Sequence, residues 1–100
     1  MIGARVRIVP KRAVLDPQGE AVQRALHELG HQDVRDVRVG RVVELVLDTT
    51  DEAAARAQVE RMSEQLLVND IVEVGDIELV PAEQVGGLAV DDAAAPAGGR

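Results

Sequence analysis

The chain has 100 residues and lacks both cysteine and aromatic side chains, and its 18 acidic and 11 basic residues give a net charge of −7. This length allows one small domain, and the absence of cysteine excludes stabilisation by disulfides. The negative charge and the lack of aromatic stacking surfaces argue against a nucleic-acid-binding protein. The sequence has no charged-then-apolar leader and no apolar run near ~18 residues. We therefore expect a cytoplasmic protein that does not enter a membrane.

The first predicted element is a β-strand over residues 4–9, where polarity alternates until Pro10 ends the pattern. Its two faces would carry Ala4, Val6 and Ile8 on one side and Arg5, Arg7 and Val9 on the other.

A helix follows, with unusually clear signals at both ends. Asp16 is a suitable N-cap, Pro17 fits the first helical position, and Gly30 fits the left-handed C-terminal cap. An apolar stripe runs along this helix through Val22, Ala25, Leu26 and Leu29. The stripe predicts that one face of the helix packs against a core.

Gly19 is the residue of this helix that local preferences do not explain. Glycine in a helix costs about 0.5–1 kcal/mol relative to alanine. Either something approaches closely there, or an exposed first turn simply tolerates glycine. The sequence leaves both interpretations open.

Two further strands are expected at residues 34–39 and 42–47, joined by a hairpin with a three-residue loop or a bulge at Gly40. Thr49 and Glu52 form a capping box for a second amphipathic helix that ends near Val68. The last strand lies within residues 71–80, where Gly75 is a candidate break.

This order of elements predicts an α+β fold, a ferredoxin-like βαββαβ sandwich with a four-stranded antiparallel sheet of order 4-1-3-2 and both helices on one face. Residues 1–80 would form the domain, and the Ala-, Gly-, Pro- and Asp-rich residues 81–100 a disordered tail. The helix-free face mixes paired charges with valines, so we expect it to be a dimer interface. Its members would be Arg5, Arg7, Val9, Val42, Glu44, Val46, Glu78 and Val80.

No group of residues predicts a catalytic, cofactor or metal site. His27 and His31 are four residues apart, but Gly30 interrupts the helix between them and no third ligand is evident. Ser63 has no nearby base, and no glycine-rich loop precedes a helix. We expect no activity of this chain alone.

Two blocks of sequence carry a family resemblance. The first is Leu15-Asp16-Pro17-Gln18-Gly19 with the following Ala21-Val22-Gln23, Ala25-Leu26-His27 and Leu29-Gly30. The second is Val34 with Asp36-Val37-Arg38-Val39-Gly40-Arg41 and Glu44-Leu45. Together they resemble the PurS family, the small subunit of phosphoribosylformylglycinamidine (FGAM) synthase, over about residues 4 to 80. The family usually has aromatic residues in its strands, which this chain lacks, and residues 81–100 have no counterpart in it.

The resemblance implies a homodimer or larger oligomer that bridges a synthetase subunit, where ATP and Mg would bind, and a glutaminase subunit. That complex makes formylglycinamidine ribonucleotide from formylglycinamide ribonucleotide in purine biosynthesis, using ammonia passed on from glutamine. Candidate partner contacts lie in the two matching blocks and are Asp16, Pro17, Gln18, Gly19, Arg38, Gly40 and Arg41. The alternative is a free-standing ferredoxin-like module that binds a small effector, because a fold alone does not decide function.

Overall fold

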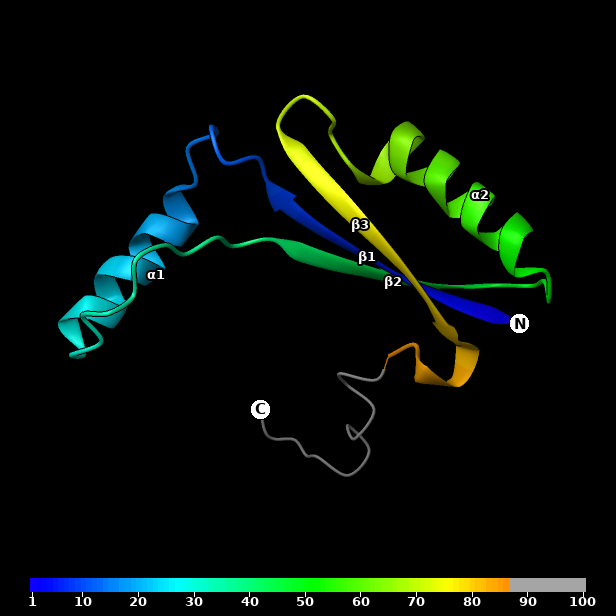
Figure 1. The fold of residues 1–100 in the computed structure, drawn as a ribbon, viewed down its shortest axis with the longest axis horizontal. Helices are drawn as coiled ribbons and strands as arrows, with labels where there is room; N and C mark the ends of the chain where they lie inside the picture. Colours follow the sequence, from blue (N-terminus) through cyan, green and yellow to red (C-terminus); the bar gives the residue numbers. More distant parts are fainter. Residues whose placement is uncertain (87–100) are drawn as a thin grey trace.

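The structure is a computed structural model that describes residues 1–86 (Figure 1). Its elements in chain order are β1 (Ile2–Pro10), α1 (Pro17–Glu28), β2 (Arg41–Leu47), α2 (Glu52–Met62) and β3 (Glu73–Pro81). A π-helical segment, Ser63–Leu67, continues α2, and a 3₁₀ turn, Ala82–Gln84, follows β3. The fold is therefore of the predicted α+β class.

The three strands form an antiparallel sheet of order β2-β1-β3. These neighbours are the ones predicted for the first, third and last strands. Val6 of β1 lies opposite Val43 of β2 and Ile77 of β3, which fixes the register. β3 runs through Gly75 without a break, and the missing side chain there makes room for Val68 at the end of the helical segment.

The core lies between the sheet and α2, which packs against β1 and β3. Its buried members are Ala4, Val6, Ile8, Leu47 and Val59. The N-cap of α2 is Asp51, whose side chain accepts a hydrogen bond from the Ala54 amide at 3.1 Å, rather than the predicted Thr49. Thr49 instead accepts a hydrogen bond from the amide of Asp51, so it binds the N-cap residue and does not cap the helix itself.

The predicted ends of α1 are confirmed, because Asp16 caps the Gly19 amide at 3.0 Å and Gly30 has a positive φ of 104°. Its predicted packing is not seen in the single chain. Figure 1 shows α1 beyond the end of the sheet, while α2 lies across the sheet. The apolar stripe of α1 is accordingly uncovered, with Leu29 75% and Val22 41% exposed.

The predicted strand over residues 34–39 and its hairpin are wrong for this chain, since in residues 1–86 this segment pairs with no strand. It runs back along α1 and continues directly into β2 (Figure 1). Its backbone groups bind side chains of α1 and its N-cap instead of a strand, as described below. Gly40 makes no hairpin turn; a side chain there would collide with the Ile8 carbonyl oxygen of β1.

Residues 81–86 fold back over the helix-free face at one end of the sheet. Pro81 is still part of β3, opposite Ile2, and Val85 lies so close to Gly3 that a larger residue at position 3 would collide with it. The predicted tail began at residue 81; its remainder, residues 87–100, lies outside the described residues.

Candidate subunit-binding surfaces

The helix-free face of the sheet carries a ladder of ion pairs across all three strands. Arg5 of β1 contacts Glu44 of β2 at 2.7 Å and Glu78 of β3 at 3.8 Å. Arg7 contacts Asp76 at 3.1 Å and also binds Glu78. The four charged residues predicted for this face are thus brought together, and Asp76 joins them.

Valines surround this ladder. Val9, Val42 and Val46 are 38%, 46% and 45% exposed, and Val74, which the sequence reasoning missed, is 48% exposed. Val74 could have been found from its place opposite Val9. Val80 shares the face but is only 8% exposed, in keeping with the fold-back of residues 81–86. The result is an apolar surface whose charges already have partners.

Hydrogen bonds within the chain influence the protonation of Glu44 and Arg7. Hydrogen bonds from Arg5 and from the Gly86 amide at 2.7 Å lower the pKa of Glu44. The hydrogen bond to Glu78 raises the pKa of Arg7. Both side chains remain charged and paired near neutral pH, so a partner that covers this face need not neutralise them.

A second cluster lies at the N-terminus of α1. The buried Asp16 carboxylate accepts hydrogen bonds from the Val39 amide at 2.9 Å and the Gly19 amide at 3.0 Å, and these two bonds lower its pKa. A side chain at Gly19 would collide with the Val37 carbonyl oxygen. The close approach that Gly19 permits is therefore made within the chain, by the 34–39 segment.

The two arginines proposed as partner contacts are also held internally. Arg38 donates to the Val14 carbonyl at 3.2 Å and to the Arg12 carbonyl. Arg41 contacts Glu73 at 2.6 Å and donates to the Leu67 carbonyl at 2.7 Å. The hydrogen bond from Arg41, together with one from the Asn69 amide, lowers the pKa of Glu73 from 4.5 to about 2.

Among the proposed partner contacts, Pro17 and Gln18 lie exposed at the start of α1, whereas Asp16 and Gly19 are buried. Five of the proposed partner contacts thus stabilise the chain's own fold: Asp16, Gly19, Arg38, Gly40 and Arg41. Their part in binding a partner stays a prediction.

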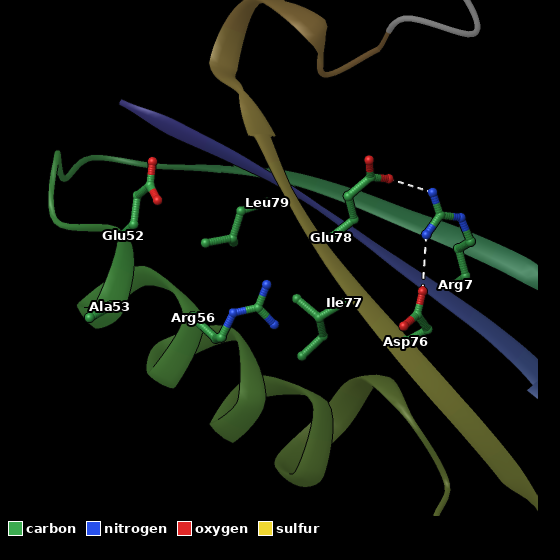
Figure 2. Close-up of a pocket in the computed structure, with 8 residues that line it drawn as sticks. All are labelled: Arg7, Glu52, Ala53, Arg56, Asp76, Ile77, Glu78 and Leu79. Carbon is green, nitrogen blue, oxygen red and sulfur yellow. Dashed lines mark hydrogen bonds and ion pairs between the residues drawn. The ribbon is translucent and has the colours of Figure 1, made fainter.

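A shallow groove lies between α2 and β3 (Figure 2). Ile77 and Leu79 lie between the helix and the strand, while Arg7 joins Asp76 and Glu78 on the far side of β3. Its lining contains no serine, cysteine or histidine, and the carboxylates of Asp76 and Glu78 are both bound by Arg7. The groove was not predicted from the sequence.

The two histidines are separate in the structure. His27 donates from its ring to the Val34 carbonyl at 2.8 Å, which fastens the 34–39 segment to α1. Within residues 1–86, no three metal-ligating side chains gather. The helices of this region are all too short or too polar to cross a membrane.

Comparison with known proteins gives a consistent result. A family model described as PurS, phosphoribosylformylglycinamidine (FGAM) synthase, matches residues 3–81. The PurS subunit of this synthase from Synechocystis sp. is 40% identical over 79 residues, which make up 79% of this chain and 79% of that protein.

Solved structures agree with the sequence matches. The structure of PurS from B. subtilis has a TM-score of 0.69 at 39% identity and covers 80% of this chain and 99% of its own. A chain in the structure of PurLQS from Thermotoga maritima has a TM-score of 0.72 at 26% identity, covering 79% of this chain and 96% of that one. The matched family region extends from the second residue of β1 to the end of β3 and includes α1, β2 and α2.

Proposed function

The chain belongs to the PurS family, and we propose that it serves FGAM synthase as the small, non-catalytic subunit that joins a synthetase subunit to a glutaminase subunit. It would act in the cytoplasm, in de novo purine biosynthesis. The observation that carries this proposal is the family match over residues 3–81. The PurLQS structure from Thermotoga maritima, which contains a similar chain, supports the idea of a complex with two kinds of partner.

The chemistry of the complex would take place on the partners. ATP and Mg would bind the synthetase subunit, the glutaminase subunit would release ammonia from glutamine, and this chain would hold the two so that ammonia passes between them. Its own surfaces suit this role, since they offer paired charges and exposed valines rather than a nucleophile with a base.

The helix-free face would hold two copies of the chain together. Its exposed Val9, Val42 and Val46 supply apolar area, and the Arg5–Glu44 pair can be covered without leaving an unpaired charge. Two such faces related by a two-fold axis would each present the same patch, as expected for a homodimer.

A pull-down with the tagged chain from its native cell extract tests the role. We expect the synthetase and glutaminase subunits among the captured proteins, identified by mass spectrometry. The matched control is the same tagged chain with the exposed N-terminal residues of α1 changed, Pro17→Ala with Gln18→Ala. Reduced capture by this variant would support the proposed contacts, and capture of neither enzyme by the unchanged chain would contradict the role.

A further inference from the structure

Strand β3 lies at an edge of the sheet and has an open outer side. The strand order β2-β1-β3 gives it one neighbour, and within residues 1–86 no other strand pairs with it. It is nine residues long and pairs with β1 without a bulge from Glu73 to Pro81. Proteins usually protect such an edge by a short strand, a bulge, a proline or charged side chains. Before Pro81, the protection of β3 consists of acidic side chains alone, so its outer N–H and C=O groups can pair with a strand that tolerates them.

A groove runs along this open edge, between β3 and α2 (Figure 2). Its central part is lined by Ile77 and Leu79 of β3 and by Ala53 and Arg56 of α2. Ile77 also lines a hollow towards the start of β3, and Leu79 lines another at its end, near Pro81. The three hollows therefore follow β3 along its length, a shape that suits an extended peptide chain.

The two faces of β3 favour different side chains in a strand added beside it. On the helix-covered face the neighbours would be Ile77 and Leu79, which are half-buried and apolar. On the other face they would be Asp76 and Glu78, whose side chains are 74% and 43% exposed although both contact Arg7. Successive residues of a strand point to opposite faces of the sheet. An added strand would therefore alternate apolar and basic residues, as β1 does on the inner side of β3.

The charge of the groove favours the same kind of strand. The groove and its two continuations are lined by two arginines, Arg7 and Arg56, and by six carboxylates. The carboxylates belong to Glu52, Glu60, Glu64, Asp70, Asp76 and Glu78. This excess attracts a basic segment and disfavours the β3 of a second copy, which would bring like charges side by side.

We propose that the outer edge of β3 and the groove beside it bind an extended segment of a partner protein, as an added strand in which apolar and basic residues alternate. Backbone hydrogen bonds to β3 give affinity, while the apolar side chains lie against Ile77 and Leu79 and the basic ones beside Asp76. This is a third contact surface, in addition to the helix-free face and the start of α1. It does not depend on the synthetase and glutaminase role.

A short synthetic peptide tests this mode of binding. The peptide alternates valine and arginine, has blocked ends and begins with one tryptophan. Because the chain has no aromatic residue, the anisotropy of tryptophan fluorescence reports the peptide alone. In one control peptide the valines and arginines are grouped instead of alternating. In the other, the backbone nitrogens are methylated, which removes the N–H donors that strand pairing needs.

Two variants of the full chain locate the binding in the groove. Ala53 lines the groove, whereas its neighbour Ala54 does not, and both are exposed positions of α2. Ala53→Lys would place a long basic side chain in the groove, and Ala54→Lys makes the same change of net charge outside it. Circular dichroism checks that both variants fold.

We expect the alternating peptide to bind the parent chain and to slow amide hydrogen exchange within β3, as measured by NMR. Ala53→Lys should weaken the binding by about tenfold or more and Ala54→Lys by about twofold or less. Equal effects of the two variants, equally tight binding of either control peptide, slowed exchange at β2 in place of β3, or no binding of peptide at millimolar concentration would each overturn the proposal. The pull-down with the tagged chain tests the synthetase and glutaminase role, so the two can fail independently.

Discussion

At the first turn of α1, the missing side chain of Gly19 allows the Val37 carbonyl to pass. Gly19→Ala should therefore destabilise the fold by about 1–3 kcal/mol through overpacking, although alanine is the better helix former by roughly 0.5–1 kcal/mol. Urea unfolding followed by far-UV circular dichroism measures the effect. Gln18→Ala, at an exposed position of the same turn, is the control. A Gly19→Ala protein as stable as its parent would mean that the 34–39 segment does not pack against α1 as described.

Glu73 predicts a specific acid sensitivity. Its pKa is lowered from 4.5 to about 2, chiefly by the hydrogen bond from Arg41. Its contribution to stability is therefore complete above about pH 4.5 and is lost as pH falls towards 2. Glu73→Gln should lower the stability at neutral pH and flatten its dependence on pH in that window.

Urea unfolding at neutral pH and at about pH 3 compares Glu73→Gln with the parent chain and with Glu60→Gln on the exposed side of α2. The Glu73 variant should approach the parent as the pH falls. If the free energies of unfolding of the Glu73→Gln variant and the parent differ by the same amount at both pH values, the Arg41–Glu73 pair does not form in solution.

At the scale of elements, local signals predicted the ends of α1 and the adjacency of three strands. Asp16, Pro17 and Gly30 act through neighbours within a few residues, so sequence alone suffices for them. The path of residues 34–39 could not be read in this way. The valines of this segment suit a strand, but its contact with α1 depends on Asp16, Gln23 and His27, which are distant in sequence.

The candidate surfaces also have one part that the sequence pattern predicts and one part that it does not. The period of two along the strands placed Arg5, Glu44 and Glu78 on one face, and the structure pairs them. The fold-back of residues 81–86 had no sequence signal, because its contacts at Val85 and Gly86 are made to β1 and β2.

This fold-back yields a prediction about the end of the domain. A chain that stops after Val80 should be less stable than one that stops after Gly86, because it loses the Arg5 bond to the Gln84 carbonyl at 2.8 Å and the Gly86 bond to Glu44. Thermal unfolding followed by circular dichroism compares the two. Equal midpoints would indicate that residues 81–86 do not hold to the sheet.

The valine face predicts the effect of a charge placed in it. Val46→Glu would put a second carboxylate near Glu44, where an unpaired charge buried in the proposed interface costs several kcal/mol, so the proposed dimer should dissociate. Arg24→Glu on α1 is the control. Gln23 is unsuitable as a control, since it binds the Arg35 carbonyl. Sedimentation at micromolar concentration measures the oligomeric state of each variant. A Val46→Glu protein as oligomeric as its parent would show that this face is not the dimer interface.

At the scale of the whole molecule, one small core supports a sheet with exposed valines on one face, and helix α1 carries an uncovered apolar stripe. A domain of this size buries only about 60 to 65% of its unfolded surface. The uncovered areas indicate a component of an assembly. The synthetase and the glutaminase proposed above would be the other components.

Reconstitution tests this account most directly. The purified synthetase and glutaminase of the same organism are assayed for glutamine-dependent formation of formylglycinamidine ribonucleotide, with and without this chain, and the chain is also assayed alone for glutamine hydrolysis and ATP use. Product should form from glutamine only when all three proteins are present, and the chain alone should carry out neither reaction. Full activity without the chain, or either activity in the chain alone, would contradict it.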